Sequence, residues 1–224
     1  MNIFIYWNYK DGDSKKIYSF LNDSEFIESV KEREDIVFHK EFENFELTEE
    51  IVKEIEGSDV ILFFTHGDSD AILKFRYKDP LLKQRFVFID KGNASILKKK
   101  KVIAICCNSA RELGNFCMNG DIKSEFYIGF ADDITYDEGF TNDFKSIVYK
   151  TYSKAFSEVV LNAYKGHWSA DKFVKRLRKN ISDMMTDEIL KANLRLGSSG
   201  QATFHKKTAN SLLVLGNAEA LVFA

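Results

Sequence analysis

Short runs of apolar residues alternate along this chain with stretches in which apolar residues recur every three or four positions. The runs predict β-strands, and the wider spacing predicts amphipathic helices. The strongest strand predictions are Asp59–Thr65, Lys101–Cys106 and Phe126–Phe130, which are almost wholly apolar, as strands buried on both faces are. The alternation predicts an α/β fold in which crossover helices pack against a mainly parallel sheet.

Weaker patterns of the same two kinds fill the rest of the chain. Asn22 followed by Glu25 predicts the start of one helix, and Thr48 predicts the start of another that ends at Gly57. The other predicted elements are strands Asn2–Tyr9 and Ile36–Phe42, a hairpin-like pair Ala71–Tyr77 and Arg85–Asp90, a short helix Asn93–Lys99, long helices Asp143–Lys165 and Ala170–Leu196 (a break near Asp183 is left open), and closing strands Leu212–Leu215 and Ala220–Phe223. No repeat or linker divides them, so we expect a single domain over residues 1–224.

The composition narrows the class of protein. With 224 residues, of which 45% are hydrophobic, the chain can build one sizeable core. The 29% of charged residues argues against a disordered protein and against a membrane protein. The net charge of −2 provides no overall positive potential that would attract nucleic acid. Ile3–Trp7 is too short for a secretory or membrane segment, and three cysteines argue against a disulfide-stapled scaffold. We therefore expect a cytoplasmic globular protein without nucleic-acid or membrane partners.

Two reactive side chains directly follow the strongest predicted strands. His66, with Gly67 after it, follows one of them, and Cys107 follows another. Functional groups of an open parallel sheet collect beyond the carboxyl ends of its strands. If these two strands are neighbours, an imidazole and a thiol project from adjacent strand ends, which is the arrangement of a cysteine nucleophile and its general base.

The same place in the sequence supplies donors for an oxyanion. A thiol with a pKa near ~8.5 is mostly protonated at neutral pH, so a nearby imidazole must take its proton. Gly67 has no side chain, so a substrate carbonyl could approach its N–H, and the N–H of Cys107 is a second candidate. We expect Asn108 and Ser109 to shape the turn, and a helix over Asn108–Leu113 to add the positive end of its dipole.

The order of these motifs resembles a known family. A strand ending in His66–Gly67, the segment KVIAICCNSARELG, the segment FYIGFADDI and a long helix are similar to those of CHAT peptidases in the caspase-like clan. Cys107 occupies the position of the catalytic cysteine, and Cys106 stands where the family usually has alanine. The late segment LLVLGNAEALVF is similar to the closing pair of strands. The resemblance runs from about Asp59 to the C-terminus.

The resemblance implies a caspase-like three-layer fold, with a central mainly parallel sheet flanked by helices. It implies a dyad of His66 and Cys107, no metal, no organic cofactor, and endopeptidase activity on a protein substrate. It also implies activation by a regulatory protein or ligand, and bacterial relatives are frequently effectors of antiphage defence. Strand alternation allows only one of the two adjacent sulfurs to meet His66, and the family pattern favours Cys107 over Cys106.

Four carboxylates follow the segment FYIGF, namely Asp132, Asp133, Asp137 and Glu138. In several caspase-clan peptidases an acidic residue in a comparable region pairs with a basic side chain just before the scissile bond. Asp132 and Asp133 therefore predict a preference for Arg or Lys at that substrate position, through charge-assisted hydrogen bonds. The alternative is a solvated acidic loop with no part in recognition.

Other interpretations stay open beside the peptidase. The main alternative is a caspase-like scaffold that docks a partner protein without catalysis, and a thiol-reactive probe separates the two. A nucleotide binder ranks last because the chain has no GxGxxG or P-loop pattern. The basic run Lys98–Lys101 is interpreted as the solvated start of a buried strand rather than an anion site. His39, His167 and His205 lack the spacing of zinc ligands.

Overall fold

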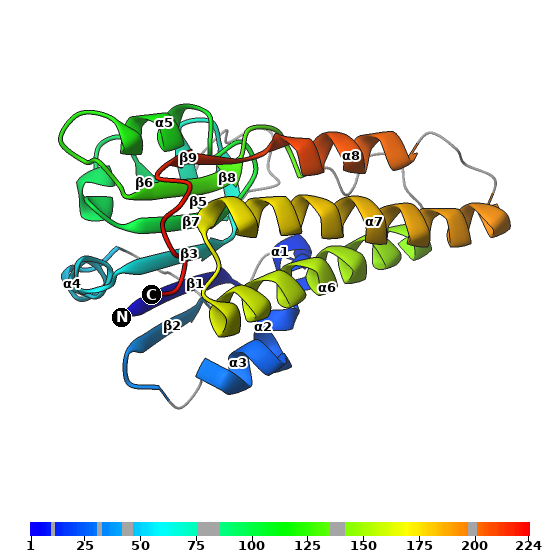
Figure 1. Cartoon of the computed structure of the whole chain (residues 1–224), viewed down its shortest axis with the longest axis horizontal. Coiled ribbons are helices and arrows are strands. Elements are labelled where there is room, and N and C mark those ends of the chain that lie inside the picture. Colours follow the sequence, from blue (N-terminus) through cyan, green and yellow to red (C-terminus); the bar gives the residue numbers. More distant parts are fainter. Residues whose placement is uncertain (10–11, 31–32, 42–46, 76–85, 135–141, 197–200) are drawn as a thin grey trace.

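The centre of the molecule is a six-stranded sheet (Figure 1). The computed structural model of the chain describes residues 1–9, 12–30, 33–41, 47–75, 86–134, 142–196 and 201–224. The strands lie in the order β2-β1-β3-β7-β8-β9, and neighbours are parallel except for β8 and β9. Their bounds are β1 Ile3–Asn8, β2 Ile36–Glu41, β3 Val60–Phe64, β7 Lys101–Ile105, β8 Phe126–Phe130 and β9 Leu212–Gly216. The predicted, mainly parallel sheet is confirmed.

A smaller antiparallel sheet continues directly from β3. Its strands, in the order β4-β5-β6, are β4 His66–Asp68, β5 Ala71–Phe75 and β6 Phe86–Asp90. The predicted hairpin is β5 with β6, and residues 76, 77 and 85 of that prediction lie outside the described residues. The sequence pattern gives no signal for β4, which is three residues long. This strand holds His66 in an ordered ladder rather than in a loop.

Helices cover both faces of the large sheet. Side chains alternate along each strand, so Ile3 and Ile5 pack into one apolar cluster while Phe4 and Tyr6 pack into another. The first cluster is covered by α1 Gly12–Ile17, α2 Phe20–Asp23, α3 Glu25–Val30, α6 Asn142–Gly166 and α7 Ala170–Leu196. The second is covered by α4 Glu49–Gly57, the 3₁₀ helix η1 Ala94–Leu97 and α5 Glu112–Met118. The result is the caspase-like three-layer fold.

Near its C-terminal end the chain differs from the sequence-based expectation. α7 runs without a break through Asp183. A further helix, α8 Gln201–Ser211, has no predicted counterpart; it packs against α7 and β9 (Figure 1). The predicted strand Ala220–Phe223 is wrong, because only an isolated bridge joins Leu221 to Ser169. The segment is instead held by scattered backbone hydrogen bonds, such as the one from the N–H of Val222 to the carbonyl of Trp168 at 2.8 Å.

Helix starts are set by side-chain caps. Thr48 caps α4 as predicted, since its Oγ1 accepts a hydrogen bond from the N–H of Ile51 at 3.3 Å. The helix predicted to start at Asn22 starts later, because Ser24 Oγ accepts the N–H of Ile27 at 3.3 Å and Asn22 lies within α2. The hydroxyl of Ser24 therefore caps α3 in place of the expected Asn22.

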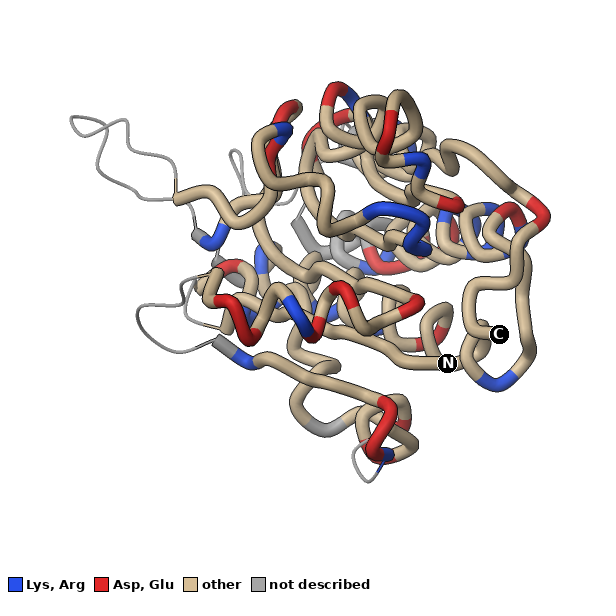
Figure 2. The backbone as a smooth tube through the Cα atoms, turned by 90° about the vertical axis from the view of Figure 1, so that its left-hand side faces the viewer, with Lys and Arg blue, Asp and Glu red and all other residues tan. Residues whose placement is uncertain are grey.

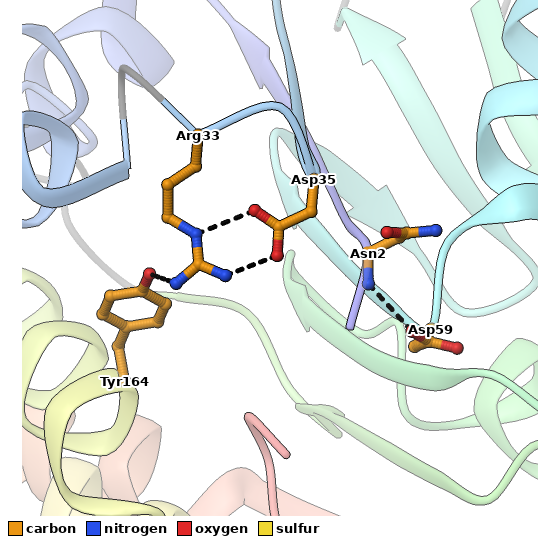
Figure 3. A network of polar contacts seen from close by, with 5 residues as sticks. All are labelled: Asn2, Arg33, Asp35, Asp59 and Tyr164. Atoms are coloured by element: carbon orange, nitrogen blue, oxygen red, sulfur yellow. Dashed lines mark hydrogen bonds and ion pairs between the residues drawn. The ribbon is translucent and has the colours of Figure 1, made fainter.

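Polar contacts fix the starts of the first strands (Figure 3). The backbone N–H of Asn2 donates to Asp59 Oδ2 at 2.8 Å. The guanidinium of Arg33 donates to both carboxylate oxygens of Asp35, which lowers the pKa of that carboxyl, and to the hydroxyl of Tyr164 on α6 at 2.5 Å. These contacts join the start of β2 to the helical layer that covers the first cluster.

Charged residues of both signs are spread over the surface. In the view of Figure 2, acidic and basic positions are interspersed along the described backbone. Among the helices as far as the structure describes them, none is both long and apolar enough to cross a membrane.

Candidate active site

β3 and β7 are hydrogen-bonded neighbours that end at the same edge of the sheet. Their last residues pair with each other, so His66 and Cys107 each follow two positions after a strand end. The hydroxyl of Tyr18 holds both ends together, because it lies 2.6 Å from the carbonyl oxygen of Ile105 and 3.4 Å from that of Thr65. The prediction that these two strands are neighbours is confirmed.

Gly67 brings the two strand ends into direct contact. A Cβ atom at this position would lie 2.4 Å from the carbonyl oxygen of Cys107, 3.2 Å from its nitrogen and 2.8 Å from the Cβ of Cys106. No side chain fits there, so the space between the strands requires glycine. The segment that carries His66, whose side chain is 8% exposed, therefore touches the segment that carries Cys107. The N–H groups of Gly67 and Cys107, the two candidate oxyanion donors, belong to these touching segments.

The two adjacent cysteines point to opposite faces of the sheet. Cys106 is fully buried in the second cluster, and burial raises the pKa of its thiol far above the ordinary value. Cys107 packs against the first cluster and keeps exposed surface. Its Sγ accepts a hydrogen bond from the N–H of Ile134 at 3.3 Å. Since Cys117 is buried as well, Cys107 is the accessible thiol of the three.

A tight turn leads from Cys107 toward β8. Asn108 has a φ of +55°, in the left-handed region that asparagine tolerates better than most residues. Its N–H donates to the carbonyl of Asp132 at 3.2 Å, and its Nδ2 donates to Asp133 Oδ1 at 2.6 Å. Ser109 is buried, and its Oγ donates to a backbone carbonyl inside the turn at 3.1 Å. Asn108 and Ser109 therefore shape the turn, as the sequence predicts.

The helix expected directly after Cys107 begins later. α5 starts at Glu112, and the N–H groups of Glu112 and Leu113 donate to the carbonyl of Ser69 at 2.9 and 2.8 Å. The left-handed backbone of Asn108 prevents a helix from starting at that residue. The prediction of a helix dipole beside the sulfur is therefore wrong, and the turn between β4 and β5 occupies the first donors of α5.

The two carboxylates predicted to select the substrate lie at the same edge of the sheet. Asp132 pairs with Lys207 of α8 at 2.7 Å, and this hydrogen bond lowers the pKa of Asp132. Asp133 accepts the side-chain amide described above. A cationic substrate side chain would therefore share these carboxylates with groups of the protein. Asp137 and Glu138 lie outside the described residues.

α8 contributes residues that no sequence motif singles out. His205 is 1% exposed, and its Nδ1 lies 3.0 Å from the hydroxyl of Tyr152 on α6. Thr208 Oγ1 donates to the backbone carbonyl of Asp133 at 3.4 Å, and Lys207 holds the preceding carboxylate. The helix thus contacts both α6 and the segment that leaves β8. In the sequence, the single histidine His205 is the only residue of this helix that suggests a functional role.

The basic run Lys98–Lys101 lies away from this edge, at the start of β7. Lys101 Nζ donates to the carbonyl of Ala224 at 3.2 Å, and Lys100 Nζ donates to the carbonyl of Glu56 at the other end of the strands. The part of the chain that the structure describes holds no group of three or more histidine, cysteine or carboxylate side chains placed for a metal ion.

Comparisons with known proteins identify a shared fold. No family model and no curated protein matches the sequence. A solved structure described as "Structure of Protease" matches with a TM-score of 0.54 and 12% sequence identity. The match covers 98% of this chain and 48% of that chain, so this chain spans about half the length of that protein. At this identity the likeness shows the fold alone, and the fold agrees with the three-layer architecture.

Proposed function

We propose that this chain is a cysteine endopeptidase of the CHAT type, with Cys107 as nucleophile and His66 as general base. The observation that carries the proposal is the contact between the two strand ends, where Gly67 packs against the Cys107 backbone and the Cβ of Cys106 too closely for a side chain. The exposed surface of Cys107 and the fold shared with a structure described as a protease also support it.

In the proposed reaction, His66 removes the proton from the Cys107 thiol, and the sulfur bonds to the carbonyl carbon of the substrate. The N–H groups of Gly67 and Cys107 donate to the oxyanion of the tetrahedral intermediate. His66 then gives the proton to the leaving amine as the C–N bond breaks, and water hydrolyses the thioester to regenerate the thiol. These steps require neither a metal nor an organic cofactor.

The proposed substrate is a protein with Arg or Lys before the scissile bond, selected by Asp132 and Asp133. Both carboxylates lie at the edge that carries Cys107, and both already accept hydrogen bonds from cationic or amide groups, as they would from such a substrate. We propose that a regulatory protein or ligand switches the activity on. The proposed setting is the cytoplasm of a bacterium, in defence against phage, and it rests on the family resemblance.

Proteome-wide mapping of new N-termini by mass spectrometry tests the function. The chain is incubated with protein mixtures, alone and with the products of neighbouring genes. We expect Cys107→Ala and His66→Ala to abolish cleavage while circular dichroism shows an unchanged fold. Cys106→Ala and Cys117→Ala, which remove buried thiols, are the matched controls and should keep most activity. Cleavage that survives Cys107→Ala, or that is lost in Cys106→Ala, contradicts the assignment.

A further inference from the structure

Segment 131–134 directly follows β8 and is bound by α8. Lys207 pairs with the carboxylate of Asp132 at 2.7 Å. One residue further along the same helix, Thr208 donates through Oγ1 to the backbone carbonyl of Asp133 at 3.4 Å. Two successive residues of α8 therefore hold two successive residues of this segment, one through a side chain and one through the backbone.

The inner side of the same segment touches the thiol. The N–H of Ile134 donates to the Sγ of Cys107 at 3.3 Å, and the Ile134 side chain is buried in the first apolar cluster. A donor aimed at the sulfur stabilises the thiolate more than the thiol, because its positive end faces the charge that forms on deprotonation. The position of the Ile134 N–H therefore affects the fraction of Cys107 that is present as the nucleophilic thiolate.

We propose that α8 positions the Ile134 N–H to stabilise the Cys107 thiolate, and that Lys207 and Thr208 are the positioning residues. The inference rests on the proposed function, since it assigns a means of regulation to the same thiol. A shift of α8 relative to this segment would therefore change the reactivity of Cys107 without any new group contacting the sulfur.

Cys106 and Tyr152 interact electrostatically with this thiol, and His205 lies against Tyr152. His66 follows the neighbouring strand end, and Asp132 and Asp133 belong to the segment itself. Burial raises the pKa of Tyr152 and of Cys106, and it lowers the pKa of His205 to about 4. Tyr152, Cys106 and His205 therefore stay uncharged around neutral pH. These three uncharged groups are unchanged in each variant below. A difference in Cys107 reactivity between matched variants is therefore attributed to a change in the position of segment 131–134.

The test is the rate at which iodoacetamide alkylates Cys107, measured against pH on the full chain and resolved by peptide mass spectrometry. Lys207→Glu places a negative charge against Asp132, which should push the segment away from the sulfur. We expect this variant to lower the thiolate fraction of Cys107 at neutral pH by about tenfold and to move the rate curve to higher pH. Lys206→Glu is the matched control, because it makes the same charge change at the preceding, exposed residue.

Two further variants complete the test. In the swapped pair Asp132→Lys with Lys207→Glu, the two charges attract again, and we expect the rate curve to return toward that of the parent chain. Ile134→Pro removes the donor itself and should move the curve in the same direction as Lys207→Glu. If Ile134→Pro fails to fold, the charge reversal and the swap still decide the matter.

Three results would overturn the inference: equal curves for Lys207→Glu and Lys206→Glu, an unchanged curve for Lys207→Glu, or no recovery in the swapped pair. Alkylation needs no peptide substrate, so this outcome is separate from that of the proposed function. A chain that never cleaves a protein can still show the effect of α8 on the thiol. A chain that cleaves proteins can equally lack it.

Discussion

Cys106 and Cys107 are neighbours in sequence but differ in chemistry, because successive side chains of a strand point to opposite faces. Burial raises the pKa of Cys106 far above its usual range and that of Cys117 to about 12, so neither thiol ionises appreciably between about pH 7 and about pH 9. We expect iodoacetamide to modify Cys107 alone in the folded chain, and all three thiols in guanidinium. Peptide mass spectrometry checks this. Rapid labelling of folded Cys106 would reverse the assignment, and an inert Cys107 would favour a non-catalytic scaffold.

Gly67 matters through the space that it leaves. In Gly67→Ala the new methyl group would overlap the Cys107 carbonyl, so the strand ends must separate. We expect the free energy of unfolding to fall by about 1–3 kcal/mol, as for other overpacked sites, and cleavage to fall at least about tenfold. Denaturant titration and the cleavage assay measure the two effects. Gly57→Ala is the control, because no atom outside the neighbouring residues and the backbone of its own helix lies within 4 Å of a Cβ placed there; equal behaviour of the two variants would contradict the close contact.

The proposed preference for Arg or Lys before the scissile bond depends on two carboxylates, those of Asp132 and Asp133. Asp132→Asn and Asp133→Asn each remove a negative charge beside the site, and we expect each to lower the ratio of cleavage after Arg to cleavage after Leu by about tenfold. A ratio is measured because it cancels any change in the thiol itself. Asp121→Asn, which lies before β8 at the opposite edge of the sheet, should leave the ratio unchanged. A parent preference for acidic or large apolar residues would disprove the selection.

At the scale of elements, the segment between α1 and α2 holds the two strand ends through Tyr18. Tyr18→Phe removes a hydroxyl that lies 2.6 Å from one strand-end carbonyl and 3.4 Å from the next. We expect a loss of about 1 kcal/mol in the free energy of unfolding and a marked loss of cleavage. Tyr149→Phe is the matched control, since its hydroxyl donates to the carboxylate of Asp13 on α1 at 2.7 Å. It should lose similar stability and keep cleavage; parallel losses of cleavage would refute the positioning role.

Some of the elements that form the site can be predicted from the sequence, and others cannot. β3, β7 and β8 are predictable because strands buried on both faces must be apolar throughout, and the rule that parallel strands end at one edge then brings His66 near Cys107. The start of α5 is not predictable, because the left-handed turn at Asn108 is set by bonds to the distant segment after β8. The part played by α8 is hidden for the same reason, since its partners at the site come from other elements.

At the scale of the whole molecule, a buried histidine links stability to pH. His205 is 1% exposed, and burial lowers its pKa from the ordinary 6.5 to about 4. Between these two values the unfolded chain binds a proton that the folded chain does not. Protons therefore favour unfolding, and the free energy of unfolding should fall as the pH drops from 6.5 toward 4, by up to about 3 kcal/mol from this group.

His205→Asn tests this because it removes the titrating ring and keeps a polar group for the Tyr152 hydroxyl. We expect the variant to be less stable than the parent above pH 6.5, where the packing of the ring is lost, and to show a smaller decline in stability as the pH falls. Denaturant titrations across this range measure the two slopes. His167→Asn removes an exposed histidine and supplies the comparison. Equal slopes in the parent and in His205→Asn would mean that His205 binds its proton equally well in both states, which a sealed contact between α8 and α6 does not allow.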